Sequence, residues 1–200
     1  MIRKRKTKDP CVECGLHLER CICREILRLD LQTQIVLMVH AKELKRTTNT
    51  GRLALKALTN AHLVVRGEST ERVDVSALLG GGYQDLLLYP SDDADDLNDF
   101  KRDGRPVRLF VPDGNWRQAA KVAIRHPELA TVPRVKLSTP FDPYAPRLRR
   151  EPKEGGMATL EAIAHALAIL EGQTVAEQIL GIYQAKLKAT LIGRGKKIDI

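Results

Sequence analysis

Short apolar runs alternate with segments of helical periodicity along most of the chain. The run at residues 34–40 is apolar, rich in β-branched side chains and bounded by polar residues, a pattern typical of a buried strand. Four further runs of this kind lie at residues 62–65, 85–89, 107–111 and 134–137. Two of them are followed at once by a proline, Pro90 and Pro112, which interrupts strand pairing. The pattern therefore predicts five strands.

Apolar residues spaced three and four apart predict four helices between and after these strands. The helices are predicted to begin in the polar run 47–50, near Asn115, at an N-cap Thr159, and at a capping box of Thr174 and Glu177. The first helix extends its apolar face to Ala61, and the third stops at Gly172.

Strands that alternate with helices predict an α/β fold with a mostly parallel sheet covered on both faces. Ligands in such folds bind beyond the carboxyl ends of the strands. This rule selects the loops after Tyr89, Val111 and Leu137 as the place for a site.

Composition limits the organisation of the chain. Its 200 residues are 43% apolar, which suits one domain with an appendage, and we expect an N-terminal module at residues 1–30 and an α/β body at 31–200. No apolar stretch is long enough to span a bilayer, and no apolar segment follows the basic start. We therefore expect a cytoplasmic protein with no membrane partner, either a monomer or a small homo-oligomer.

Charge is unevenly distributed in this chain of net charge +8. Basic clusters lie at residues 3–8 and 186–197, and an acidic loop lies at residues 92–99. Basic clusters contact phosphates with an affinity that falls as salt rises, so the pattern points first to RNA or DNA. A solubilising surface remains the alternative for either cluster. The chain contains no P-loop, Gly-x-Ser-x-Gly or Gly-x-Gly-x-x-Gly motif.

All four cysteines of the chain lie together, at Cys11, Cys14, Cys21 and Cys23. A Cys-x-x-Cys turn directs two thiolates at one ion, and four thiolates complete a closed structural zinc site. The Cys-x-Cys pair is less usual, and His17 is a possible substitute for one thiolate. Two disulfides or unligated thiols are the alternatives, but a disulfide framework belongs to small secreted domains. We expect a structural Zn²⁺.

The loop at residues 111–118 contains the highest density of potentially reactive side chains. A Pro-Asp-Gly turn there directs the Asp113 carboxylate at the strand-end crevice. The alternative is structural: Asp113 or Asn115 caps the next helix, Gln118 completes a capping box, and Trp116 packs in the core. Arg117 favours function, because a cation in the first turn of a helix opposes the macrodipole.

A second candidate segment runs from residue 144 to residue 161. It has four cations between residues 147 and 153, then the Gly155-Gly156 hinge, then a helix start. A long loop of this kind favours a substrate-holding role over a plain linker. Glu161 either complements the helix dipole or binds a ligand amine.

Taken together, these stretches resemble the DTW-domain family, which is named for an Asp-x-Thr-Trp motif. The motif reads Asp113-Gly114-Asn115-Trp116 here. The other matching segments are the cysteine module and residues 37–40, 49–54, 87–90, 133–135, 148–152 and 159–162. The chain departs from the family pattern at Asn115, which replaces threonine, and at Ala158, where relatives often carry serine.

Members of this family look like bacterial tRNA-uridine aminocarboxypropyltransferases. The resemblance implies transfer of the 3-amino-3-carboxypropyl group of S-adenosylmethionine to N3 of a tRNA uridine, in the variable loop, with release of methylthioadenosine. It also implies a SPOUT-like, knotted catalytic domain at residues 31–200. The alternatives are an S-adenosylmethionine-dependent rRNA-modifying transferase or RNA methyltransferase, and a non-catalytic zinc-containing RNA-binding protein.

On this resemblance, Asp113 is the candidate base that accepts the N3 proton. The expected cofactor contacts are Leu88, Tyr89, Pro90, Asp113, Gly114, Asn115, Trp116, Leu148, Arg149, Met157, Ala158, Thr159 and Glu161. The expected tRNA contacts are His40, Arg52, Arg117 and Arg150. For His40 a structural role is the alternative. Arg52, Arg149 and Arg150 are expected to bind either the methionine carboxylate or tRNA phosphates.

Overall fold

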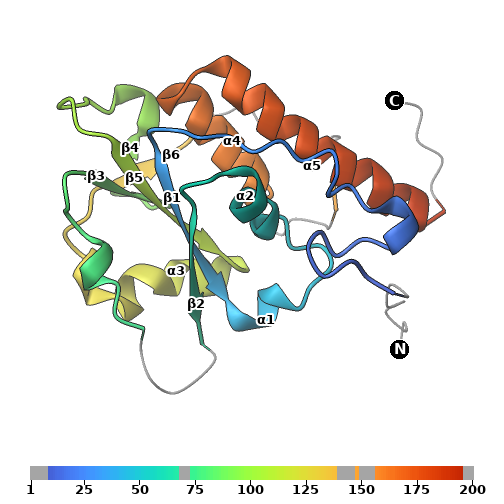
Figure 1. Ribbon diagram of the computed structural model, residues 1–200. Helices are drawn as coiled ribbons and strands as arrows, with labels where there is room; N and C mark the ends of the chain where they lie inside the picture. Colours follow the sequence, from blue (N-terminus) through green and yellow to red (C-terminus); the bar gives the residue numbers. More distant parts are fainter. Residues whose placement is uncertain (1–8, 68–72, 139–146, 149–155, 196–200) are drawn as a thin grey trace.

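A six-stranded parallel sheet with helices on both faces forms the body of the protein (Figure 1). The computed structural model describes residues 9–67, 73–138, 147–148 and 156–195. The strands are β1 (Gln34–His40), β2 (His62–Arg66), β3 (Gln84–Leu88), β4 (Asp95–Asp96), β5 (Val107–Asp113) and β6 (Arg134–Lys136). The α-helices are α1 (Ala41–Leu44), α2 (Gly51–Ala57), α3 (Trp116–Arg125), α4 (Thr159–Leu170) and α5 (Gln173–Gly193). Short 3₁₀ turns lie at Leu18–Arg20, Ser76–Leu78, Leu97–Asp99 and Pro127–Leu129.

The order of the strands across the sheet is β2-β1-β5-β3-β6-β4, and every pair is parallel. The prediction of a parallel α/β fold is therefore confirmed, and all five predicted strands are present. The two-residue strand β4 lies in the acidic loop and was not predicted. Because all strands run in one direction, their carboxyl ends share one edge of the sheet, where β5 lies between β1 and β3.

Strand β5 does not stop at Pro112, contrary to the sequence prediction. Pro112 and Asp113 both pair with β1, opposite Met38 and Val39. On the other side, pairing with β3 ends at Phe110. Past that point β5 is an edge on its β3 side, and a strand edge tolerates a residue without an N–H donor. The strand thus carries Asp113 to the carboxyl edge as its last residue.

Several helix boundaries also differ from the predictions. Helix α2 ends at Ala57 rather than Ala61, and the short helix α1 was not predicted. Thr159 is the first residue of α4 and Ala158 is its N-cap, so the hydroxyl of Thr159 is available for another bond. The predicted capping box at Thr174 is wrong, because α5 already begins at Gln173 after a sharp turn at Gly172 with φ of +107°.

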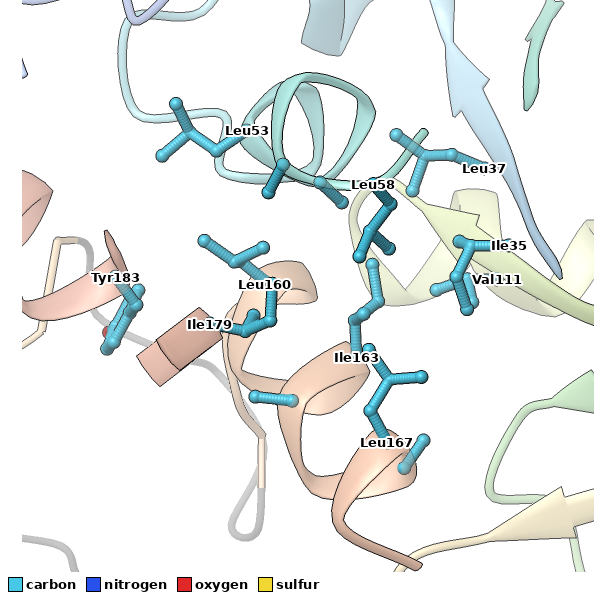
Figure 2. Packing of buried hydrophobic residues seen from close by; sticks show 14 of the residues in the cluster. Ile35, Leu37, Leu53, Leu58, Val111, Leu160, Ile163, Leu167, Ile179 and Tyr183 are labelled. Atoms are coloured by element: carbon cyan, nitrogen blue, oxygen red, sulfur yellow. The ribbon is translucent and has the colours of Figure 1, made fainter. Parts of the chain in front are cut away.

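The two faces of the sheet carry two separate apolar clusters. The larger cluster joins β1 and β5 to α2, α4 and α5, and Figure 2 shows Leu58, which follows α2, and Ile163 of α4 packed toward Ile35 and Val111 of the sheet. The smaller cluster joins the opposite face to α3 through Val122. Both faces of the sheet are covered, which explains why the five inner residues of β1 are all apolar and buried.

The N-terminal module packs on the larger cluster, which includes Cys14, Leu16 and Ile22. The division at residue 30 remains a prediction, and so does the knot, because residues 139–146 and 149–155 lie outside the described part of the chain. Within that described part, no helix has the length and apolarity required to cross a membrane.

Candidate functional site

The four cysteine sulfurs converge at one point. The Sγ atoms are 3.5 Å apart for Cys11 and Cys21, 3.7 Å for Cys11 and Cys23, and 3.8 Å for Cys14 and Cys21. All four lie within 4.8 Å of one another. A tetrahedron with Zn–S bonds of about 2.3 Å has edges of about 3.8 Å, whereas a disulfide bond is much shorter. The geometry therefore fits one tetrahedral metal ion, and none of the four cysteines forms a disulfide in this structure.

A fully buried lysine supports this cysteine cluster from α5. The Nζ of Lys186 donates a hydrogen bond to the carbonyl of Cys14 at 2.5 Å. Burial lowers the pKa of Lys186 to about 8, and the nearby thiols of Cys14, Cys23 and Cys11 act in the opposite direction. Four thiolates around a dication carry a net negative charge, so a cation at this position compensates it.

Arg52 of α2 joins the cysteine module to the body of the protein. Its guanidinium donates to the carbonyls of Val12 and Glu13, inside the Cys-x-x-Cys turn, and to the carbonyl of Leu44. Its backbone N–H donates to Asn49 at 3.1 Å. Arg52 was predicted to contact tRNA; the structure gives it these internal bonds, and a role in tRNA binding remains a prediction.

Asp113 is 2% exposed and lies at the carboxyl end of β5. The amide of Asn49 donates to its Oδ2 at 2.5 Å, and the hydroxyl of Thr159 donates to its Oδ1 at 2.6 Å. Both donors come from segments far away in the sequence, the loop before α2 and the first turn of α4. These two bonds hold the carboxylate in one orientation at the end of the strand.

Gly51 makes the close approach to this carboxylate possible. A Cβ atom at Gly51 would lie 2.8 Å from Oδ2 of Asp113 and 3.0 Å from Cδ2 of Leu37, both shorter than normal contacts. The first residue of α2 therefore has to be glycine if Asp113 is to keep its position.

A cavity lies beside Asp113, between the loop before α2 and the start of α4. Its wall combines residues that were predicted for the site with residues that were not. The predicted ones are Asp113, Leu148, Ala158 and Thr159. The others are Glu43, Thr48, Asn49, Thr50, Arg147 and Tyr183.

Two charged side chains in this wall were not named as contacts from the sequence: Glu43, which was missed, and Arg147, which lies in the predicted substrate-holding loop. Glu43 is 1% exposed and lies 3.2 Å from the guanidinium of Arg46. Arg147 donates to the carbonyl of Gly156 at 2.8 Å. Glu43 follows the end of β1, where the carboxyl-edge rule applies, so its position was a usable signal. Nothing in the spacing of residues 47–50 distinguishes the amide of Asn49 from a helix cap.

Of the motif residues 113–116, Asp113 lines this cavity, whereas Gly114, Asn115 and Trp116 are not part of its wall. The side chain of Asn115 accepts from the N–H of Gln118 at 2.9 Å, and Gln118 accepts from the N–H of Asn115 at 2.8 Å. This capping box confirms the structural alternative for Asn115. Trp116 is half-buried at the start of α3, and so it is not a core residue.

The remaining predicted contacts are spread over the same edge of the sheet. Tyr89 lines a second cavity, on the α3 face, while Leu88 is buried at the end of β3. Glu161 accepts from the N–H of Ala158 at 3.0 Å, which gives it the helix-start role. Pro90, Gly114 and Met157 do not line the cavity beside Asp113.

Among the predicted tRNA contacts, His40 ends β1 and accepts from the N–H of Lys42 at 3.2 Å. Arg117 is exposed on α3. Arg149 and Arg150 lie outside the described residues, as does most of the basic loop between residues 144 and 155.

Comparison with known proteins supports one family. The family model described as the DTW domain matches residues 8–191. A Drosophila melanogaster protein named tRNA-uridine aminocarboxypropyltransferase 2 is 30% identical over 86% of this chain and 71% of its own length. Proteins of the same name from Mus musculus and Macaca fascicularis are 26% and 25% identical. The chain spans 60% and 61% of these two relatives. All three are animal proteins, whereas the resemblance pointed to bacterial members. No solved structure is significantly similar to this chain.

Proposed function

Because this chain belongs to the DTW domain family, we propose that it is a tRNA-uridine aminocarboxypropyltransferase. Its substrates are then a tRNA uridine and S-adenosylmethionine, and its products are the N3-modified uridine and methylthioadenosine. The three relatives carry this activity in their names, and the chain shares most of its length with them.

The observation that carries the proposal is the position of Asp113. A buried carboxylate held by two donors at the carboxyl edge of a parallel sheet, beside a cavity, is the arrangement that a general base requires.

S-adenosylmethionine supplies, when bound, an electrophilic Cγ attached to a sulfonium leaving group. Uridine N3 carries a weakly acidic proton, and it must give up this proton to act as a nucleophile. Asp113 accepts that proton, directly or through one water, while the new N3–Cγ bond forms and the Cγ–S bond breaks. The electron pair of the broken bond stays on sulfur, which becomes a neutral thioether. Asn49 and Thr159 keep the carboxylate in one orientation throughout.

The cavity wall has the charges that an amino acid group requires. Arg147 is a cation that can face the methionine carboxylate, and Glu43 is an acid that can face the ammonium group. Leu148, Ala158 and Thr159 supply the apolar and hydroxyl surface beside them. Aiming Cγ rather than methyl at the nucleophile is a matter of positioning, so a rigid wall of this kind serves the reaction.

The cysteine cluster has a structural role in this proposal. Four thiolates complete the coordination of Zn²⁺ and leave no open position for water, so the ion takes no part in the transfer. Its task is to hold the module against α2 and α5, where Arg52 and Lys186 bind its backbone carbonyls.

Mass spectrometry of nucleosides from unmodified tRNA incubated with the protein and S-adenosylmethionine tests the proposal. We expect an adduct with the mass of a 3-amino-3-carboxypropyl group on uridine, together with methylthioadenosine. A methyl adduct with S-adenosylhomocysteine would identify a methyltransferase instead. Modification of ribosomal RNA but not of tRNA would reject the substrate, and an absence of S-adenosylmethionine binding in calorimetry would reject the enzyme.

A further inference from the structure

Helix α3 carries a row of cations along its exposed side. Arg117, Lys121 and Arg125 recur every four residues, so they lie on one side of the helix, about 6 Å apart along its axis. All three are exposed, and none has an ion-pair partner among the described residues. The helix contains no acidic residue. Like charges at this spacing destabilise a helix, so folding gives no reason for the row.

Further cations extend this row to the carboxyl edge of the sheet. Arg66 of β2 is 5% exposed and donates to the carbonyls of Met38 and Gln118 at 3.3 and 3.2 Å, the second of which belongs to α3. The pKa of His40 is lowered mainly by burial and also by the positive charges of Arg66, Lys42 and Arg125, while Glu43 raises it. Arg66 therefore places one more positive charge between α3 and the ends of β1 and β2.

An apolar hollow of about 200 Å³ lies on the same side of the sheet. Its wall includes Tyr89, Pro112, Ala120, Ala123, Ile124 and Arg134. Ile124 is 79% exposed next to the cationic row. An aromatic ring, small apolar residues and a row of cations together fit a flat base attached to a charged backbone, which is the chemistry of single-stranded nucleic acid.

The hollow and the proposed active site share the end of one strand. Pro112 lines the hollow and Asp113, the next residue of β5, lines the cavity on the other face. Successive residues of a strand point to opposite faces, so the two recesses lie back to back at the carboxyl edge. Figure 1 shows α3 on the side of the sheet opposite to α4 and α5.

We propose that the exposed side of α3 is the docking surface for the RNA substrate. Arg117, Lys121 and Arg125 bind successive phosphates, and the hollow takes an unpaired base that neighbours the modified uridine. The uridine itself reaches around the end of β5 to Asp113. This inference rests on the proposed function, since it assigns the substrate of the same site to a surface.

The test is a triple variant of the 200-residue chain that removes the three positive charges of α3: Arg117→Gln, Lys121→Gln and Arg125→Gln. The control combines Arg24→Gln, Arg28→Gln and Lys101→Gln, which removes equal charge from exposed positions on the zinc module and in the loop before β5. Affinity for a tRNA transcript is measured by fluorescence anisotropy over a range of salt concentrations. Thermal unfolding and calorimetry with S-adenosylmethionine show that both proteins are folded.

We expect the α3 variant to bind tRNA at least ten-fold more weakly at low salt and the control to stay within about three-fold of the wild type. Three lost phosphate contacts reduce the slope of log K against log salt by about 2–3. An equal loss of tRNA affinity in both variants would show that only the net charge of the protein matters, and this result would overturn the proposal. Unchanged tRNA affinity in the α3 variant, with lost binding to phosphatidylserine vesicles, would assign the row to a membrane instead.

The hollow has its own variant, Ala120→Gln, which fills space without a change of charge. We expect a several-fold rise in KM for tRNA, and an unchanged KM would overturn the placement of a base there. These two experiments, on the α3 variant and on Ala120→Gln, also distinguish a wrong docking surface from a wrong proposed function. A wild-type protein that does not modify tRNA rejects the function, whereas a wild type that does so, beside an α3 variant with unchanged KM, rejects only the docking surface.

Discussion

The cysteine cluster and the Asp113 cavity are built in opposite ways. All four sulfurs come from residues 11–23, and the cluster needs little more than the local turns that bring them together. The carboxylate of Asp113 depends on donors that lie 64 and 46 residues away, in the loop before α2 and at the start of α4. One site is a property of a short segment, and the other is a property of the whole fold.

The two sites are nevertheless connected. Arg52 binds the backbone of the Cys-x-x-Cys turn with its side chain and binds Asn49 with its N–H, and Asn49 binds Asp113. The cysteine module therefore contacts the loop that orients the proposed base. The cysteine cluster depends on local turns, and it is connected through Arg52 to the Asp113 cavity, which is assembled from distant segments.

Loss of the carboxylate has the largest expected effect on the reaction. Asp113→Asn keeps the shape of the side chain but removes the proton acceptor, and we expect transfer to tRNA to fall about 10²–10⁴-fold. Calorimetry should show that S-adenosylmethionine still binds. Asp92→Asn, an exposed carboxylate of the acidic loop, is the matched control. Activity near the wild-type level in Asp113→Asn would remove the base from the mechanism.

Loss of a metal ligand is expected to act on stability first. Cys23→Ser should lower the zinc content from one ion per chain, as measured by mass spectrometry of the metal. A loss of about 3 kcal/mol, comparable to that of a cross-link, corresponds to a Tm lower by roughly 6–12 °C. Val12→Ser, at an exposed position inside the same turn, should change neither quantity. Full zinc content in Cys23→Ser would contradict the four-thiolate site.

A methyl group at Gly51 should displace the carboxylate of Asp113 without removing it, so this variant tests whether the position of the carboxylate matters. Gly51→Ala places a Cβ 2.8 Å from Oδ2, and displacement of the carboxylate should lower kcat about 10–100-fold. Gly181→Ala in α5 is the control, because its Cβ meets open space and alanine favours a helix. Its Tm should equal or exceed that of the wild type. Equal kcat in the two variants would show that the contact with Gly51 is not needed.

Arg52→Lys tests the connection between the two sites and has the smallest expected effect. Lysine keeps the charge but cannot bind the carbonyls of Val12, Glu13 and Leu44 together. We expect kcat to fall several-fold and zinc to be lost faster to a chelator, with little change in KM for tRNA. Arg28→Lys is the control at an exposed position. A rise in KM alone would favour the original prediction that Arg52 contacts tRNA.

Several elements follow from local pattern alone. The strand at residues 34–40 matches β1 in both bounds, since a continuous apolar run can only be buried between two faces of a sheet. The capping box of Asn115 and Gln118 was also predictable, because both bonds form within one helical turn. The predictions failed where tertiary contacts decide: β5 runs through Pro112 because only β1 pairs with it there.

By itself, the sequence determined the α/β class, the parallel sheet, the cysteine cluster and the strand-end position of Asp113. These depend on periodicity, on ligand spacing and on the rule that parallel strands end at one edge. Only the tertiary structure decided that Asn49 and Thr159 hold the carboxylate, that Glu43 and Arg147 share its cavity, and that Lys186 supports the cysteines. Such contacts join residues that are distant along the chain, and the pattern of one segment carries no information about the side chain that another segment brings to it.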